Sequence, residues 1–146
     1  IHKNYLCVTV GIPPKKHDVL TAYHQRNEQT KVVKISSRKS PDNKTMVTEY
    51  NVVKVNNEDN LALLDINLIT GRTHQIRAHM AYEGYPLLGD GKYGINRINR
   101  IYNIKTQALY SYKLSFEFTT SAGCLEYLNG RVFCVENIWF ADRFFK

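Results

Sequence analysis

The hydrophobic and polar positions of this chain follow mainly the two-residue period that is typical of β-strands. Six segments are rich in valine, isoleucine, leucine, threonine and aromatic residues, and several of them alternate apolar with polar positions. Clusters of proline, glycine, asparagine and aspartate separate most of them, as expected for turns. The pattern therefore predicts strands over residues 3–10, 31–36, 45–55, 61–69, 107–118 and 132–138.

Helical patterning is confined to short stretches. Residues 73–83 (THQIRAHMAYE) have helical spacing of apolar positions, a suitable N-cap in Thr73, and Gly84 directly after the last turn. Residues 17–29 are a second candidate helix, and residues 96–103 (NRINRIYN) have the composition of a polar loop or a frayed helix. Strands that follow one another with few helices between them favour the α+β class with a mostly antiparallel sheet.

Length and composition indicate one globular domain. The chain has 146 residues, of which 43% are hydrophobic, so it can form an ordinary core and is not an intrinsically disordered chain. It contains no apolar run long enough for a membrane-spanning helix and no secretory signal pattern at its start. Three cysteines without a C-x-x-C pair favour neither a disulfide framework nor a zinc site, so we expect a cytoplasmic protein.

Positive charge is concentrated in the middle of the chain. Lysine and arginine number 20 against 13 acidic residues, which gives a formal net charge of +7. From Arg72 to Lys105 there are six basic residues and two acidic ones. This excess favours an anionic partner such as a nucleic acid, although composition alone does not identify it.

Two motifs in this region suggest cofactor chemistry but do not have the context that it requires. Residues 89–94 (GDGKYG) match G-x-G-x-x-G, yet they lead into an asparagine-rich loop, and the next acidic residue is Glu117. A dinucleotide site needs this motif between a strand and a helix. His74 and His79 are five residues apart, which separates them by about 140° around a helix. We therefore expect no nucleotide cofactor and no metal.

The segment at residues 70–80 (TGRTHQIRAHM) is a better candidate site. A strand ends at a glycine turn and a helix starts at once, so free backbone N–H groups and the positive end of the helix dipole favour an anion. His74 and Arg77 share one face of that helix, while Ile76 and Met80 share another that can be buried. The alternative is a solvated surface helix. The residue types suit capture of a phosphate or carboxylate by a planar two-pronged arginine contact.

Aromatic side chains are abundant enough for base stacking. The chain has ten tyrosines, and most of them are expected in the core or at its rim. Those that could offer a flat face to an unstacked nucleobase are Tyr5, Tyr82, Tyr85, Tyr93 and Tyr110.

Taken together, these segments resemble a known enzyme family. TGRTHQIRAHM, followed shortly by GYPLLGDGKYG, resembles the signature of the RluA-type pseudouridine synthases, and residues 3–11 (KNYLCVTVG) are similar to the strand that precedes it. The resemblance extends over residues 3–118 and implies a pseudouridine-synthase-like mixed, mostly antiparallel sheet with few short helices. It also implies an isomerase without metal or cofactor that converts uridine to pseudouridine in ribosomal or transfer RNA.

The resemblance assigns roles to individual residues. Tyr5 would lie against the target base, with its hydroxyl assisting removal of the carbon-5 proton, and Arg77 would pair with the catalytic aspartate. Leu109 matches a hydrophobic position that lines the uracil pocket, although the family often has Leu-His-Ala where this chain has residues 109–111 (LYS). Three further residues would help to bind substrate, shape the site or hold the backbone: Arg72, His74 and Gln75.

The chain departs from the family at the catalytic aspartate. That residue lies in an HRLD-type motif ahead of the first strand, and none of the six aspartates here follows Arg-Leu. Asp90 matches a structural position of the glycine turn, and Asp65 lies within a strand. We therefore expect residues 1–146 to be the C-terminal portion of a single synthase catalytic domain, inactive alone. We further expect Arg77→Ala to abolish activity in a longer protein while leaving its folding intact.

Two other functions remain open from the residues alone. A non-catalytic RNA-binding module could keep the same fold without the aspartate. An enzyme acting on a small phosphate ligand could use the glycine turn at Gly71, and it would bind small anions even when RNA competes. In all but the last case the expected partner is RNA, with no membrane and no metal.

Overall fold

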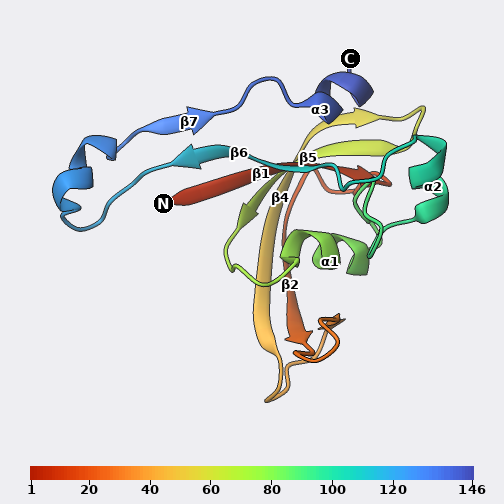
Figure 1. The fold of residues 1–146 in the computed structure, drawn as a ribbon, viewed down its shortest axis with the longest axis horizontal. Helices are drawn as coiled ribbons and strands as arrows, with labels where there is room; N and C mark the ends of the chain where they lie inside the picture. The colour runs from red at the N-terminus through yellow and green to blue at the C-terminus, as the bar shows by residue number, and fades with distance from the viewer.

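The fold is a single antiparallel sheet with a few short helices. The computed structural model describes all 146 residues (Figure 1). Every neighbouring strand pair is antiparallel, in the order β3-β2-β4-β5-β1-β6-β7, which confirms the predicted α+β class. None of the helices has the length and apolar character needed to cross a bilayer. The elements are β1 (His2–Val10), β2 (His17–Arg26), β3 (Val33–Ser36), β4 (Lys44–Asn56), β5 (Leu61–Leu68), α1 (Gln75–Tyr82), α2 (Asn96–Ile101), β6 (Leu109–Ser115), the 3-10 helix η1 (Gly123–Leu128), β7 (Val132–Cys134) and α3 (Trp139–Phe144).

The helix predicted at residues 17–29 is wrong, because most of this segment is strand β2. Its main chain pairs with β4 along eight residues and with β3 along four. Val19, Thr21 and Tyr23 alternate with the residues between them, and such β-branched and aromatic side chains suit a strand. Backbone pairing with β4 covers residues 17–24, and pairing with β3 covers residues 23–26, so these ladders provide the hydrogen-bond partners of β2.

Helix α1 was predicted in the right place, but its start was not. Thr73 is not the N-cap: His74 occupies that position with φ 53°, in the left-handed region, and no side chain caps the helix. The Thr73 carbonyl oxygen is instead bonded to the His24 ring at 2.9 Å. Residues 96–101, for which a loop or frayed helix was expected, form helix α2.

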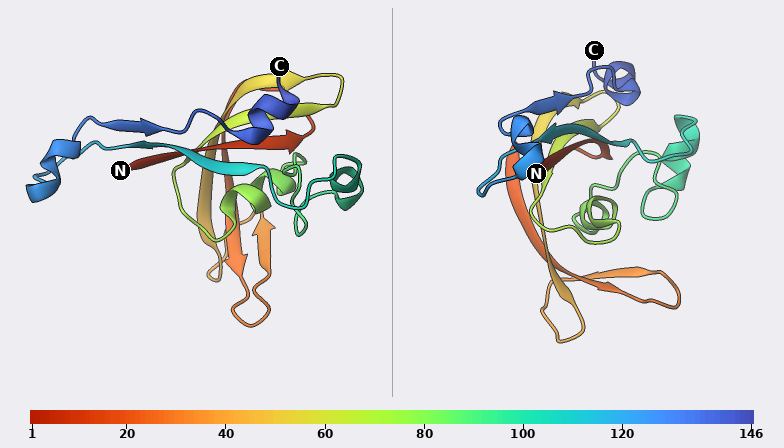
Figure 2. Two further views of the ribbon diagram at one scale, coloured as in Figure 1. Left: turned by 45° about the horizontal axis from the view of Figure 1, so that its top comes forward. Right: turned by 60° about the vertical axis from the view of Figure 1, so that its left-hand side comes forward.

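The sheet has an apolar core on each of its two faces. Cys7, Leu64 and Ile66 point to one face, where Ile76 and Met80 of α1 pack on them. The alternate residues of the same strands point to the other face, which α3 covers with Phe140 and Phe144. Figure 2 shows α1 and α3 on the two sides of the central strands. The predicted burial of Ile76 and Met80 is confirmed.

The chain after α1 continues the sheet beside β1. The Val10 N–H donates to the Pro86 carbonyl at 2.8 Å, and the Leu88 N–H donates to the Val8 carbonyl at 2.9 Å. Gly89 follows with φ +83°, and a Cβ there would lie 2.1 Å from the Thr106 carbonyl oxygen. A glycine is therefore required at Gly89, and this close approach fixes the turn at residues 89–94 against the returning chain.

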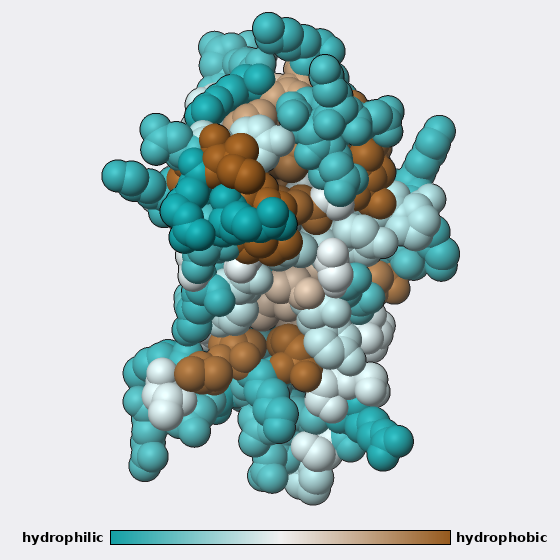
Figure 3. Space-filling model, turned by 90° about the vertical axis from the view of Figure 1, so that its right-hand side faces the viewer, coloured by the Kyte–Doolittle hydropathy of each residue, from teal (hydrophilic) through white to brown (hydrophobic).

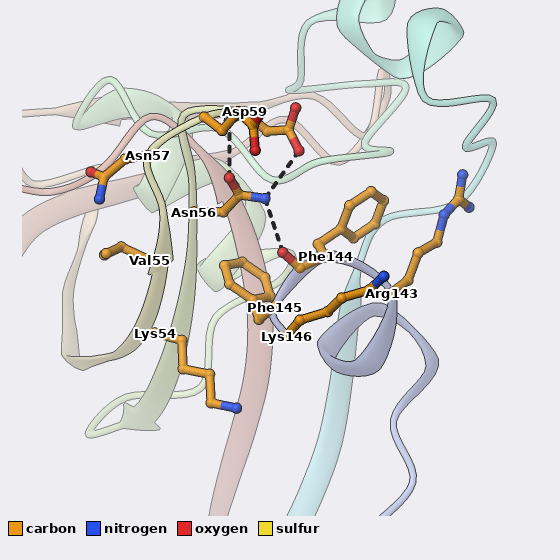
Figure 4. Close-up of a pocket in the computed structure, with 10 residues that line it drawn as sticks. Lys54, Val55, Asn56, Asn57, Asp59, Arg143, Phe144, Phe145 and Lys146 are labelled. Atoms are coloured by element: carbon orange, nitrogen blue, oxygen red, sulfur yellow. Dashed lines mark hydrogen bonds between the residues drawn. The ribbon is translucent and has the colours of Figure 1, made fainter.

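The C-terminal third forms a long arm and a returning helix. β6 and β7 form one edge of the sheet, and together with η1 they extend beyond the rest of the molecule (Figure 1). This arm exposes apolar side chains such as Tyr127, which is 70% exposed. Helix α3 then returns to the β4–β5 turn. There the Asn56 side-chain amide donates to the Phe144 carbonyl at 3.0 Å and to Asp59 at 3.0 Å (Figure 4). These bonds hold α3 over the core.

Candidate active site

Arg77 and Asp90 form a two-pronged ion pair at the edge of α1. Arg77 Nε donates to Asp90 Oδ2 at 2.6 Å, and Arg77 Nη2 donates to Asp90 Oδ1 at 3.0 Å. The Asp90 side chain is 0% exposed and that of Arg77 is 16% exposed. Sequence analysis predicted that an arginine of residues 70–80 could make a planar two-pronged contact with a phosphate or carboxylate, but it identified neither Arg77 nor Asp90 for it. The pairing of Arg77 with a catalytic aspartate stays a prediction.

The surroundings of Asp90 keep it ionised. Its Oδ1 also accepts the backbone N–H groups of Lys92 and Tyr93, each at 2.9 Å. Burial raises the pKa of the Asp90 carboxyl group, but the hydrogen bonds from Arg77 and from the two N–H groups outweigh this effect. The net result is a pKa below the ordinary value. The bond to Asp90 in turn raises the pKa of Arg77. The ionised Asp90 carboxylate therefore fixes the orientation of the Arg77 guanidinium.

Tyr93 joins this pair to His74. The Arg77 guanidinium carbon lies 5.2 Å from the centre of the Tyr93 ring, and the Tyr93 hydroxyl group is bonded to His74 Nδ1 at 3.0 Å. Lys92 Nζ lies 5.4 Å from the same ring and donates to the Lys31 carbonyl at the tip of the β2–β3 hairpin. Burial, followed by the charges of Arg77 and Lys92, lowers the pKa of His74. The Tyr93 hydroxyl group thus holds the His74 ring near the positive charges of Arg77 and Lys92.

Gln75 and Arg72 hold the backbone at the start of α1. The Gln75 amide donates to the Val47 carbonyl at 2.9 Å and to the Thr48 hydroxyl at 3.0 Å. Its oxygen accepts the Thr70 hydroxyl and the Arg72 N–H, both at 2.9 Å. The Arg72 side chain donates to the Thr45 carbonyl at 3.1 Å. Of the roles expected for these residues, holding the backbone is the one that these contacts support.

His79 completes this network beneath the helix. Its side chain is 0% exposed, and its Nδ1 is bonded to the Thr48 hydroxyl at 2.8 Å. Its Nε2 has no hydrogen-bond partner, and the nearest carboxylate, that of Glu83, is 3.7 Å away. Burial lowers the pKa of His79 to about 4. His79 and His74 lie in separate environments, and no cluster of three metal-ligating side chains is present.

We expect the buried His79 to lower the stability of the protein in mild acid. In the unfolded chain its pKa is near the ordinary value of 6.5, so the unfolded state binds more protons between pH 6.5 and 4. This contribution to stability is complete above pH 6.5 and is lost as the pH falls toward 4. The shift corresponds to about 3 kcal/mol. Urea titrations at several pH values in this range measure the free energy of unfolding. As the pH falls from 6.5 to 4, the unmodified chain should lose about 3 kcal/mol more of this free energy than His79→Asn loses. An unchanged pH profile would contradict the assignment.

Tyr5 and Leu109 lie on the face of the sheet that α1 covers. Tyr5 pairs with Ile66 in β5 and with Ser111 in β6, and it packs against the core cluster that contains Ile76 and Met80. Leu109 begins β6 opposite Cys7 and packs against the same cluster. The structure thus brings Tyr5, Leu109 and the helix that carries Arg77 to one face. The hollow in Figure 4 contains none of these residues.

Sequence reasoning missed Thr48, the pairing role of Asp90, and the contacts of Tyr93 with Arg77 and His74. Asp90 and Tyr93 are three residues apart in the glycine turn that was singled out, so the motif did locate them. Nothing in the local sequence indicates that this turn folds onto α1. Thr48 lies 31 residues from His79, within a strand, and carries no motif.

A family model and several known proteins match this chain. The model described as RNA pseudouridylate synthase matches residues 1–82, which include Tyr5 and the segment at 70–80. The uncharacterized RNA pseudouridine synthase YhcT of Bacillus subtilis is 49% identical over 57 residues, which are 39% of this chain and 19% of that protein. Ribosomal large subunit pseudouridine synthase C of Buchnera aphidicola is 32% identical across 80% of this chain and 37% of its own length. The chain therefore spans well under half of these relatives.

Solved structures agree on the fold. Human RNA pseudouridylate synthase domain containing 1 superimposes with a TM-score of 0.71 at 20% identity, over 97% of this chain and 56% of that chain. Human RNA pseudouridylate synthase domain containing 4 gives a TM-score of 0.68 at 19% identity, over 95% of this chain and 59% of that chain. The antiparallel sheet with its short helices is therefore that of pseudouridylate synthase domains.

Proposed function

The chain belongs to the RNA pseudouridylate synthase family, and we propose that it supplies one side of the active site of an RluA-type enzyme. The reaction is the isomerisation of uridine to pseudouridine in RNA. One observation supports the proposal most directly: Arg77, held by Asp90, lies on a helix that covers the sheet face on which Tyr5 lies. Tyr5 and Arg77 are both within the residues that the family model matches. The names of the Buchnera and other relatives favour ribosomal over transfer RNA as the substrate.

The reaction explains why these residue types are needed. The bond between uracil N1 and the ribose carbon breaks, the base turns, and carbon 5 bonds to the same ribose carbon. Carbon 5 then loses its proton and N1 ends protonated, so no oxidant or cofactor is required. The uridine must first leave the base stack, which calls for an electropositive surface and an aromatic partner. Tyr5 supplies the ring, and its hydroxyl group is suited to accept the carbon-5 proton.

The attacking carboxylate is proposed to come from outside residues 1–146. Asp90 is unsuited to it, because Oδ1 accepts three N–H groups and Oδ2 accepts Arg77 Nε. Arg77 Nη1 donates no hydrogen bond within the chain, which leaves one N–H-bearing nitrogen to orient a second carboxylate. Arg77 would then be a positioning residue held by Asp90.

The two other functions differ in their support. A non-catalytic RNA-binding module shares the fold and is favoured by the lack of an aspartate after Arg-Leu. A small-anion enzyme at Gly71 is less well supported, because the carboxylates of Glu28 and Asp42 line the hollow there and offset much of the positive charge of the basic residues. Those basic residues are Arg26, Lys44 and Arg72.

Release of tritium from RNA labelled at uridine carbon 5 tests the proposal. The 146-residue chain alone should give no turnover, because the attacking carboxylate is missing. A longer protein that adds a segment with Arg-Leu-Asp should release tritium and form pseudouridine. Turnover by the chain alone would refute the placement of the nucleophile. RNA binding without turnover by the longer protein would instead favour the non-catalytic module.

A further inference from the structure

A polar hollow lies between the glycine turn and α2, beyond the residues that the family model matches. Its volume is about 340 Å³. Figure 3 views the end of the molecule where α2 lies, and this end is mostly hydrophilic with separate apolar patches. The hollow is lined by Gly89, Gly91, Asn96, Asn99, Arg100, Asn103, Ile104 and Lys105.

The charge around this hollow is positive and uncompensated. Arg100 and Lys105 line it, Arg97 is exposed on the same helix, and none of the three forms an ion pair within the chain. No acidic residue occurs between Asp90 and Glu117, and Asp90 is already paired with Arg77. Unpaired arginine and lysine beside a recess with no carboxylate attract an anion.

A buried asparagine fixes the hollow relative to the active site. Asn99 is 5% exposed, its Oδ1 accepts the Gly89 N–H at 2.7 Å, and its Nδ2 donates to the Asp90 carbonyl at 3.0 Å. Because Asp90 holds Arg77, α2 and the catalytic helix α1 are connected by continuous hydrogen bonds. An anion bound in the hollow would therefore lie at a fixed position relative to the base site.

Gly91 lines the hollow and carries a backbone N–H group. A Cβ at Gly91 would meet no atom within 4 Å, and its N–H donates no hydrogen bond within the chain. Backbone N–H groups, arginine forks and lysines are the usual contacts to phosphodiester oxygens, and such contacts set where a nucleic acid strand lies.

We propose that Gly91, Arg100 and Lys105 bind a phosphate of the RNA strand that flanks the target uridine. This inference rests on the proposed function and adds to it: α2 sets the position of the strand while the sheet face with Tyr5 receives the base. The three residues lie outside residues 1–82, which the family model matches.

Binding of a fluorescent single-stranded RNA containing uridine, measured by anisotropy at several salt concentrations, tests the site in the 146-residue chain. Arg100→Gln and Lys105→Gln should each weaken binding about fivefold at 0.1 M salt, because each lost phosphate contact lowers the salt slope by about 0.7. Gly91→Glu should weaken binding further than the uncharged Gly91→Gln. Arg131→Gln, on the exposed arm, is the matched control and should bind like the unmodified chain.

Three results would overturn the phosphate site. The first is no RNA binding by the unmodified chain, and the second is Arg100→Gln and Lys105→Gln affinities equal to that of Arg131→Gln. The third is displacement of RNA by inorganic phosphate at constant ionic strength, which would indicate a small-anion site. Tritium release by the longer protein is measured separately. If the longer protein turns over and the variants do not change RNA binding, the proposed function is supported and the phosphate site is refuted.

Discussion

Replacing Arg77 by alanine should lower the free energy of unfolding by about 3–5 kcal/mol, the usual cost of leaving a buried charge without its partner. Asp90 is fully buried and would keep only the N–H groups of Lys92 and Tyr93. The expectation that Arg77→Ala leaves folding intact is therefore revised by this geometry. Urea unfolding of the two proteins at neutral pH measures the difference.

A second substitution separates the charge from the packing. Arg77→Ala with Asp90→Asn should be more stable than Arg77→Ala alone, because an asparagine carries no charge and its oxygen still accepts both N–H groups. The gap between Arg77→Ala and the unmodified chain should also narrow in acid. The pKa of Asp90 is lowered in the folded state, so its contribution is present above the unfolded value of 3.8 and is lost as the pH falls through the folded value. A loss that is equal at pH 3 and pH 7 would contradict the ion pair.

Strands were predictable wherever the local pattern and the long-range pairing agree. β1, β4 and β5 are rich in β-branched or other apolar residues, and each was predicted within a few residues. Burial alternates along β4, whereas β1 and β5 contain continuous runs of buried residues. β2 was missed because its structure depends on pairing with β4, up to 34 residues away along the chain, which no local window contains. The start of α1 was missed for a similar reason. The Gln75 side chain accepts the Arg72 N–H group, and the His24 ring is bonded to the Thr73 carbonyl oxygen, so long-range contacts set the backbone where a threonine N-cap was expected.

The site was predictable as a set of residues but not as a set of contacts. The motif gave Arg77 and its helix, and the need for a two-pronged acceptor followed from guanidinium geometry. The identity of the acceptor depends on how the chain after α1 pairs with β1, which brings Asp90 back to the helix. Thr48 and Asn99 act through contacts that only the folded chain creates, so the sequence carried no signal for them.

Tyr5→Phe in the longer, active protein should leave RNA affinity nearly unchanged and slow isomerisation by about 10²–10⁴-fold, the usual contribution of a positioned proton-transfer group. The ring remains on the sheet face that α1 covers, so stacking on the base persists. Tyr5→Ala should slow isomerisation by the same factor. It should also weaken the free energy of RNA binding by about 1–3 kcal/mol, the usual contribution of stacking one base on an aromatic ring. Tritium release measures the rate, and anisotropy measures the affinity.

Tyr110→Phe is the matched control for removing a tyrosine hydroxyl group. Tyr110 lies opposite Leu6, whose side chain packs in the core on the far face of the sheet, and it is exposed. It should retain both rate and affinity. If Tyr5→Phe also retains the full rate, the hydroxyl group takes no part in removing the carbon-5 proton. Tyr5 would then act through its ring alone, and the proton would have to leave to another group near the base.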